Sequence, residues 1–293
     1  MEFRQIKYFI EVADREHVTD AAYALHVAQS AVSRQIFNLE KELGVDLFIR
    51  DGRSVKLTPI GKLFLERVKH AMNLMEDAKK EVLDYLEPEK GTVRIAFPSS
   101  LAAYTLPRAI YAFRQLYPEA QFHLKQALYN ELVDSVRKGY FNLALIAPIV
   151  KEERNIDTKV LFHENVVALL PANHPMAYYK TIDLLDLIDD PFVLLPEGFT
   201  YRKIVLDACQ EIGFEPKIAF EGDDVDALKG LVSAGLGVTL MPEMTLMDSI
   251  PKSTVKIPLR KPNLKRSVGI ITPKDRSLLP TEQLFYNFIT NFY

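Results

Sequence analysis

Residues 17–53 contain the pattern that most constrains how this chain can fold, HVTDAAYALHVAQSAVSRQIFNLEKELGVDLFIRDGR. The order of polar and apolar residues predicts a short helix that Thr19 caps, a turn at positions 26–28 and a second helix from about Gln29 to Leu43. Apolar residues of the second helix recur at spacings of four, three and four, at Val32, Ile36, Leu39 and Leu43. This spacing places them on one buried stripe, so we expect two helices packed around a tight turn.

A basic hairpin is predicted directly after the second helix. Gly44 ends that helix, and the run LFIRDGRSVKLTP fits two short strands with Asp51-Gly52 at their turn. Positive charge gathers from Arg50 to Lys69, where six Lys or Arg residues stand with only two acidic residues. The hairpin is therefore expected to form a basic wing beside the helices.

The outer face of the second helix is polar and carries Gln29, Ser30, Ser33, Arg34, Asn38 and Lys41. Short hydroxyl and amide side chains near a helix start can reach base edges, and Arg34 can form a fork with guanine or grip a phosphate. In isolation, such residues usually form a solvated surface. Because they stand on the second helix of a helix-turn-helix with a basic wing, they favour double-stranded DNA as the partner.

The charge of the chain limits how tightly one copy can hold DNA. The formal net charge of the 293 residues is −3, and residues 1–70 contain eleven Lys or Arg against ten Asp or Glu. Affinity for nucleic acid depends on neutralising phosphates, so a single module should bind weakly. The composition therefore predicts a dimer or a larger assembly.

A long helix is expected to join the copies. Thr58-Pro59 is a typical helix start, and a run with heptad spacing follows for about three heptads, at Phe64, Val68, Ala71, Met75, Ala78, Val82 and Tyr85. Such a stripe could instead pack on the helix's own domain. The strict spacing, on a helix of about 40 Å between two compact regions, favours a dimeric coiled coil.

After residue 91 the pattern of polar and apolar residues changes. EPEKG at residues 87–91 breaks the long helix, and short apolar runs then alternate with helical patterns. The predicted strands lie at 92–97, 143–147, 166–170, 192–195, 238–241 and 268–271, and the predicted helices at about 101–117, 130–139, 200–213 and 224–234. This order indicates an α/β fold whose sheets are covered on both faces.

Two strand-to-helix junctions in this region could bind an anion. Ser99 and Ser100 stand between the first strand and a helix expected at Leu101, and Thr200 follows the strand at 192, with Arg202 nearby. Free backbone N–H groups, hydroxyls and a helix start suit a carboxylate, so two such sites could clamp a dicarboxylate. The alternative is that the hydroxyls merely cap their helices.

An enzyme is the main alternative, and the residues give it little support. The single cysteine, Cys209, excludes an internal disulfide and lies in the apolar pattern of a helix without a histidine nearby, which favours an inert buried thiol. His163 and His174 lack metal-ligand spacing, and the adjacent carboxylates at 189–190 and 223–224 diverge on regular backbone. We therefore expect no catalysis, no metal and no cofactor.

A transport binding protein is a second alternative, which the α/β half alone would suggest. The segment MEFRQIKYFIEV lacks a signal-peptide pattern, and no apolar run reaches membrane-spanning length. With a DNA-binding pattern in the same chain, these observations predict a cytoplasmic protein with no membrane partner.

Three longer motifs, AVSRQIFNLEKELGVDLFIR, KLTPIGKLFL and LVSAGLGVTLMPE, resemble the LysR-type transcriptional regulators, and the resemblance covers the whole chain. It implies a winged helix-turn-helix at 1–58, a linker or dimerisation helix at 59–87 and an effector-binding domain at 91–293. It also implies a homotetramer, a dimer of dimers that pair through the long helix. The effector domain would resemble a periplasmic binding protein with subdomains of about 91–161 plus 267–293 and 162–266.

The resemblance also assigns site residues. Base-contacting positions of the family correspond to Gln29, Ser30, Ser33 and Arg34, with Arg50 and Arg53 on the wing. Effector-contacting positions correspond to Ser99, Ser100, Tyr129, Gly198 and Phe199. The family usually has a small hydroxyl residue where this chain has Tyr129, so the larger ring should narrow the cleft.

Further motifs, such as EVADREHVTDAA and EGDDVDALKGLVSAGLGVTL, are similar to family members that activate glutamate synthase expression. This similarity implies a metabolite-responsive activator of promoter DNA that works with RNA polymerase, with 2-oxoglutarate, glutamate or another small carboxylate as effector. Repression or dual regulation stays open. Ligand binding would close the cleft and change how two dimers hold DNA half-sites.

Overall fold

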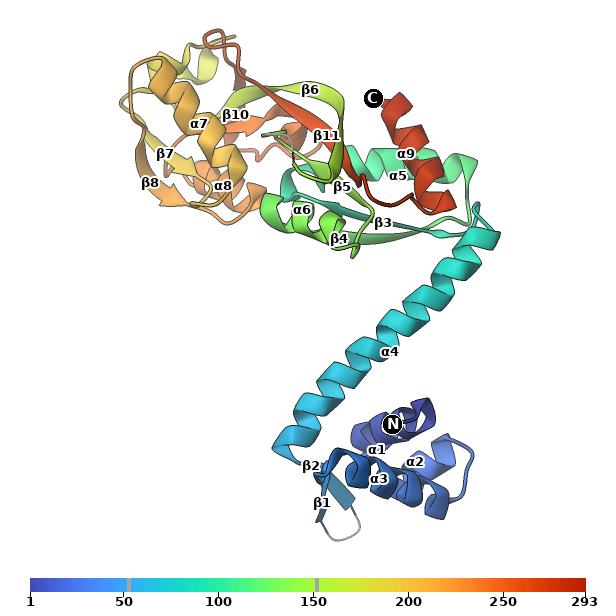
Figure 1. Cartoon of the computed structure of the whole chain (residues 1–293). Helices are drawn as coiled ribbons and strands as arrows, with labels where there is room; N and C mark the ends of the chain where they lie inside the picture. Colours follow the sequence, from blue (N-terminus) through green and yellow to red (C-terminus); the bar gives the residue numbers. More distant parts are fainter. Residues whose placement is uncertain (52–53, 151–152) are drawn as a thin grey trace. The chain divides into compact units, whose positions relative to one another are not determined.

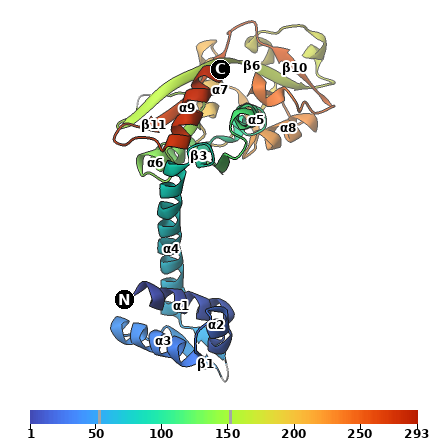
Figure 2. The same cartoon turned by 90° about the vertical axis from the view of Figure 1, so that its right-hand side faces the viewer.

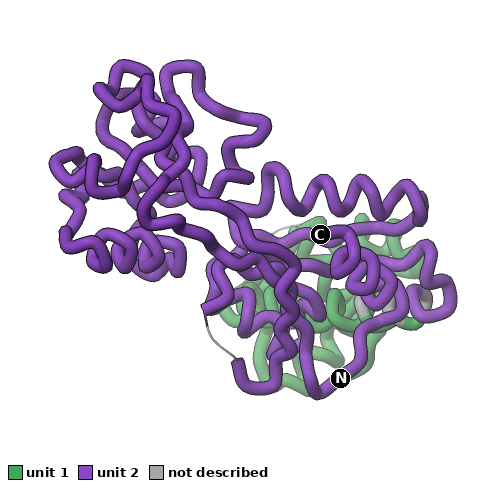
Figure 3. The backbone as a smooth tube through the Cα atoms, turned by 90° about the horizontal axis from the view of Figure 1, so that it is seen from above, with its two compact units in different colours: residues 1–82 green, residues 83–293 purple. Residues whose placement is uncertain are grey.

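The computed structural model describes residues 1–51, 54–150 and 153–293, and it divides into two compact units, residues 1–82 and 83–293 (Figure 3). The first unit contains three short helices, a two-stranded hairpin and most of one long helix (Figure 1). Their bounds are α1 Phe3–Arg15, α2 Val18–Ala24, α3 Gln29–Leu43, β1 Phe48–Asp51, β2 Ser54–Leu57 and α4 Pro59–Leu86. The predicted helix-turn-helix with a hairpin after it is confirmed.

The core of the first unit follows from the apolar stripes of its helices. The ring of Phe9 on α1 packs 5.2 Å from that of Phe48 and 5.3 Å from that of Phe64. Around these rings lie buried side chains from the other elements, among them Ala21, Ala22, Val32, Ile36, Leu39, Leu47 and Val68. The predicted stripe of α3 is thus confirmed except at its last member, Leu43, which is exposed because the chain turns away at Gly44.

The predicted cap of α2 is wrong. His17, in extended conformation, is the N-cap and its Nδ1 accepts a hydrogen bond from the Asp20 N–H, whereas Thr19 lies inside the first turn. The predicted helix start at Thr58-Pro59 is confirmed, because α4 begins at Pro59 and Thr58 Oγ1 accepts a hydrogen bond from the Gly61 N–H at 2.9 Å. Capping hydroxyls of this kind satisfy N–H groups that have no partner within the helix.

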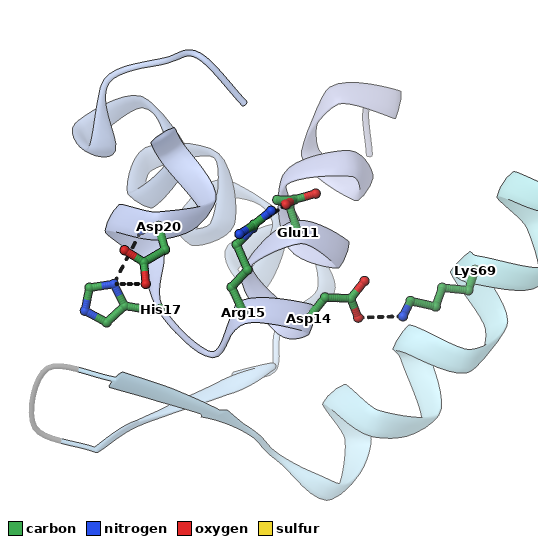
Figure 4. Close-up of polar contacts among 6 residues, drawn as sticks. All are labelled: Glu11, Asp14, Arg15, His17, Asp20 and Lys69. Atoms are coloured by element: carbon green, nitrogen blue, oxygen red, sulfur yellow. Dashed lines mark hydrogen bonds and ion pairs between the residues drawn. The ribbon is translucent and has the colours of Figure 1, made fainter. Parts of the chain in front are cut away.

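On the surface of the first unit, ion pairs connect neighbouring helices and successive turns of one helix (Figure 4). Asp14 on α1 and Lys69 on α4 form a pair with 2.5 Å between Oδ1 and Nζ, and Glu11 pairs with Arg15 one turn away on α1. These pairs are exposed, so each should contribute little stability.

The predicted dimerisation stripe on α4 divides into two parts. Phe64 and Val68 pack into the core of the first unit. Farther along, Met75 is 53% exposed and Val82 is 63% exposed, and Ala71 and Ala78 are exposed as well. The first part of the stripe therefore stabilises the unit itself, and only the second part is exposed and could pack against another helix.

The second unit contains the α/β fold, with all six predicted strands present. Its strands are β3 Thr92–Phe97, β4 Gln121–Gln126, β5 Leu143–Ile146, β6 Ile156–Pro171, β7 Pro191–Leu194, β8 Lys217–Glu221, β9 Thr239–Pro242, β10 Thr254–Pro258 and β11 Lys265–Pro273. Its helices are α5 Thr105–Leu116, α6 Tyr129–Arg137, α7 Thr200–Glu211, α8 Val225–Ser233 and α9 Pro280–Phe292, with single 3-10 turns at Ser99–Leu101, Pro175–Tyr178, Leu184–Leu187 and Glu243–Leu246.

One sheet runs through both halves of this unit, in the order β10-β6-β11-β5-β3-β4, with β9 also paired to β6. Up to Asn165, β6 pairs with β11, and from Val166 onward it pairs with β9 and β10. The strands β6 and β11 therefore connect two halves that have separate apolar cores. The predicted subdomain boundaries at 161/162 and 266/267 fall within this paired stretch.

The sheet of the first half is covered on both faces, as predicted (Figures 1 and 2). Val93 and Ile95 of β3 pack toward α5 and α9, whose Phe113 and Phe285 rings meet edge to face at 5.1 Å. Ala96, which points the other way along the same strand, packs toward α6. This alternation is the two-residue period of a strand.

The predicted helix start at Leu101 is wrong. Residues Ser99–Leu101 form a single 3-10 turn, and α5 begins only at Thr105. Pro107 explains the delay, because it has no N–H to bond the carbonyl of Ala103 and is accommodated only in the first turn of a helix. The strands β4, β8 and β10 and the helix α9 were not predicted; β4 and β8 are largely exposed and lack an apolar run.

Candidate functional site

Each unit contains one candidate site, and that of the first unit is the polar face of α3. Gln29, Ser30 and Arg34 are exposed and Ser33 is half-buried, all within the first two turns of the helix. Gln29 Nε2 donates to Ser33 Oγ at 3.1 Å. Arg34 makes no hydrogen bond or ion pair to any described residue, so its guanidinium is available for an external partner.

The wing is anchored to the end of α3. Glu40 Oε1 accepts hydrogen bonds from the N–H groups of Leu47 at 2.8 Å and Phe48 at 3.1 Å, at the start of β1. In the hairpin Arg50 pairs with Val55, although its side chain is not described, and Arg53 lies outside the described residues. The carboxylate thus fixes where the wing leaves the helix.

The second site is a cavity of about 190 Å³ in the second unit. Its wall comes from the loops after β3 and β4, from the starts of α6, α7 and α8, and from β9. The polar residues in the wall are Ser99, Ser100, Gln126, Tyr129, Glu131, Thr200, Tyr201 and Asp223. No Lys, Arg or His is among the described residues of the wall, whose only formal charges are two carboxylates.

Five of the seven predicted effector residues line this cavity: Ser99, Ser100, Tyr129, Phe199 and Thr200. The structure does not bring the other two to the wall. Arg202 Nη1 donates to the carbonyl of Leu195 and to Glu221 Oε1, both at 2.6 Å, so it braces the loop before α7. Gly198 has φ +94°, a left-handed conformation that favours glycine and explains the residue without a ligand.

The hydroxyl groups at the two strand-to-helix junctions do not cap helices. The N-cap positions of the 3-10 turn and of α7 are Pro98 and Phe199, and neither supplies a side-chain cap bond in the part of the chain that is described. Ser99, Ser100 and Thr200 line the cavity, and none of their hydroxyls makes a hydrogen bond to its own helix start in the described part of the chain. This observation weakens the capping alternative and leaves these groups available to a ligand.

A buried arginine behind Ser100 was not predicted from the sequence. Arg266 Nε donates to Glu164 Oε1 at 2.6 Å, Arg266 Nη1 donates to Ser100 Oγ at 2.9 Å, and the guanidinium lies 5.5 Å from the centre of the Tyr201 ring. Both members of the ion pair are buried, and they face each other in the register of β11 and β6. Glu164 Oε2 also accepts from the Met244 N–H at 3.2 Å.

This arrangement sets the hydrogen-bonding role of Ser100. Because its oxygen accepts from Arg266, its one O–H is left to donate elsewhere. Burial raises the pKa of Tyr201, with Glu164 adding to the effect and Arg266 opposing it, and burial raises the pKa of Tyr129. Both phenols therefore stay protonated, and neither hydroxyl has a partner among the described residues.

Other reactive residues do not form a catalytic or metal site in the described part of the chain. Cys209 is fully buried, and burial raises the pKa of its thiol to about 12, so it stays protonated and unreactive. His174 Nε2 lies 3.0 Å from Asp190 Oδ1, and no group of three metal-binding side chains occurs among the described residues. No helix in the described ranges is long and apolar enough to span a membrane.

Comparison with known proteins places both units in one family. Residues 3–62 match the model of the bacterial regulatory helix-turn-helix protein, lysR family, and residues 86–292 match the LysR substrate binding domain. The transcriptional dual regulator GltC of Bacillus subtilis (strain 168) is 53% identical over 293 residues, 100% of this chain and 98% of that protein. The HTH-type transcriptional regulator ShiR of Corynebacterium glutamicum (strain R) is 35% identical over 277 residues, 92% of each chain.

Solved structures agree with this assignment. Full-length CbnR complexed with its target DNA has a TM-score of 0.63 and 25% identity over 99% of each chain. Full-length BenM has a TM-score of 0.62 and 28% identity over 100% of this chain and 97% of that chain. The chain belongs to the LysR family and is a LysR-type DNA-binding transcriptional regulator. The predicted family and fold class are confirmed, and these relatives are regulators rather than enzymes.

Proposed function

We propose that this chain regulates transcription of glutamate synthase genes in response to a small metabolite. The observation that carries the proposal is its 53% identity, over the full length, to the transcriptional dual regulator GltC. Activation is the principal role in this proposal, and repression under a second metabolic condition is the alternative, which the description of that relative as a dual regulator supports. A regulator of promoter DNA acts beside the chromosome, so we also propose a cytoplasmic location.

Each predicted domain has its own role in this proposal. Residues 1–58 read double-stranded promoter DNA through Gln29, Ser30, Ser33 and Arg34, with Arg50 and Arg53 of the wing on the flanking backbone. Residues 59–87 pair two copies, and two such dimers form a tetramer that contacts RNA polymerase. The exposure of Met75, Val82, Ala71 and Ala78 supports the pairing, since an apolar stripe on one helix is stable in water only when covered.

The cavity of residues 91–293 is the proposed effector site. Ser99, Ser100 and Thr200 supply hydroxyl donors for a carboxylate, and Arg266, whose charge Glu164 balances, orients the Ser100 hydroxyl as a donor. The two wall carboxylates, Glu131 and Asp223, would repel the second charge of a dicarboxylate. L-Glutamate carries the same two carboxylates as 2-oxoglutarate and also an ammonium group that could face Glu131 and Asp223, so it is a second candidate.

The proposed mechanism uses the connection between the two halves of the cavity. The wall draws residues from both halves, so a ligand that contacts Ser100 and Thr200 favours the closed arrangement. Closure would alter the geometry of the tetramer and the spacing between DNA half-sites one helical turn apart, and thereby the access of RNA polymerase.

A footprint tests the proposed function directly. The full-length protein is added to the glutamate synthase promoter of the organism that encodes it, with 2-oxoglutarate, with L-glutamate or without either. We expect a protected region upstream of the promoter whose extent or DNA bend changes with one ligand and not the other. If no DNA were protected, the proposed target genes would be refuted. If the protected region and the DNA bend were the same with and without both ligands, the proposed effectors would be refuted.

A further inference from the structure

A large aromatic residue is exposed in the middle of α3. Phe37 is 63% exposed, although its helix neighbours Val32, Ile36 and Leu39 are buried in the core of the first unit. A phenyl ring in water is unfavourable, and a residue at this position could be polar without disturbing the core. Single exposed apolar side chains are common, so the position of the ring on the helix, rather than its exposure alone, indicates what it can contact.

The position of Phe37 on the helix identifies the surface to which it belongs. Ser30, Ser33, Arg34 and Phe37 have the spacing i, i+3, i+4 and i+7, which places all four on one face. Recognition helices of homeodomains contact bases with residues at this same spacing, so a residue seven places after the first contact can still reach the major groove. Phe37 thus continues the proposed DNA-reading face by one turn.

The surroundings of Phe37 favour DNA over a protein as the partner. Its neighbours on the helix surface, three and four residues away on either side, are all polar: Ser33, Arg34, Glu40 and Lys41. A protein interface would need a wider apolar patch around the ring. The major groove offers a matching apolar group of small size, the C5-methyl of thymine.

We propose that Phe37 contacts a thymine methyl group in the major groove and so specifies an A·T pair beside the bases that Arg34 and Ser33 read. The proposal rests on the proposed DNA-reading face and adds a residue that recognises a base by apolar contact rather than by hydrogen bonds. Burying one methyl group contributes about 0.8 kcal/mol, which corresponds to about a fourfold difference in affinity.

The test starts from DNA that the protein itself selects. The full-length protein enriches binding sites from a random double-stranded library, and each thymine of the selected site is then replaced by uracil, which removes only the methyl group. We expect one thymine per half-site at which uracil weakens wild-type binding by about fourfold at fixed salt. Phe37→Ala should bind both DNAs equally, and Phe37→Leu should keep part of the difference.

Tyr178→Ala is the matched control, since Tyr178 is an aromatic residue of the second unit that is 90% exposed. It should keep the wild-type response to uracil. The proposal is overturned if no thymine shows the effect, if Phe37→Ala retains it, or if Phe37→Ala instead changes the oligomeric state in sedimentation, which would make Phe37 a contact between copies. A different result would refute the proposed DNA-reading face itself. In that case Arg34→Ala would select the same sequences as the wild type, or the library would yield no preferred sequence.

Discussion

The proposed DNA-reading face of the first unit and the cavity of the second unit are built in opposite ways. The proposed face uses residues within two turns of one helix, and most of them are exposed. The cavity draws its wall from segments that span residues 98–242, and the polar groups behind it are buried. In the first case the fold needs none of the functional side chains, whereas in the second the same side chains take part in the packing.

The two kinds of construction imply different responses to substitution. Changes on the α3 face should alter DNA binding and leave folding intact. Changes around the cavity should alter folding and ligand response together, because buried polar groups that lose a partner are destabilising. Four substitutions, ordered by the size of their expected effect, examine this contrast.

Arg266→Met should have the largest effect. It would leave Glu164 buried without its partner, which typically lowers the free energy of unfolding by about 3–5 kcal/mol. Urea unfolding of the full chain, followed by circular dichroism, measures the loss. The double variant Arg266→Met with Glu164→Met should recover most of it, because two apolar side chains then face each other across β11 and β6. A stable single variant would show that the cavity is not coupled to folding through this pair.

Arg34→Ala should leave the stability of the first unit within about 0.5 kcal/mol of the wild type, because the side chain is exposed and makes no hydrogen bond or ion pair with a described residue. Specific binding to a selected site should weaken by about 1–3 kcal/mol, as for loss of a forked contact to guanine. Fluorescence anisotropy on labelled DNA measures the change, with Lys203→Ala, an exposed cation of the second unit, as the control. Equal binding by wild type and variant would remove Arg34 from the recognition face.

The same contrast explains which features of the structure could be predicted from the sequence alone. The helix Gln29–Leu43 and the start of α4 at Pro59 were predicted to the residue, because caps, glycine and apolar spacing act over a few neighbours. The apolar strands were found for the same reason. Arg266 and Glu164 were missed, because 102 residues separate them and only the sheet register brings them together. The available signal was a charged residue two positions before each of the apolar runs VVALL and VGII.

The hydroxyls of the cavity show an intermediate case. Their position after strands β3 and β7 was predictable from the rule that ligands bind at the carboxyl ends of such strands. The role of Arg202 was not, because its partner Glu221 lies on β8, an exposed strand without a recognisable pattern. Local chemistry therefore predicted residues that line the cavity, whereas long-range pairing determines which charged side chains reach it.

Glu282, on α9 of the second unit, should give a pH dependence. Burial raises the pKa of its carboxyl, against weaker opposing contributions that begin with the hydrogen bond from Asn142. The folded chain then binds a proton more tightly than the unfolded chain, so stability is lost as the pH rises from the unfolded pKa, about 4.3, through the raised folded value. Glu282→Gln has no such titration. Its melting temperature relative to wild type should therefore rise from pH 4 to pH 7, and a constant difference would contradict the assignment.

Lys69→Ala should have the smallest effect, and it provides the closest comparison with Arg266. Lys69 and Asp14 also form an ion pair between two elements far apart in sequence, but both side chains are roughly half exposed (Figure 4). Water already solvates each charge, and salt screens the pair, so its removal should change the free energy of unfolding by less than about 1 kcal/mol. The same urea titration measures it, and the difference should shrink further at high salt. If Lys69→Ala lowered the free energy of unfolding as much as Arg266→Met, burial would not explain the difference between the exposed pair Lys69–Asp14 and the buried pair Arg266–Glu164.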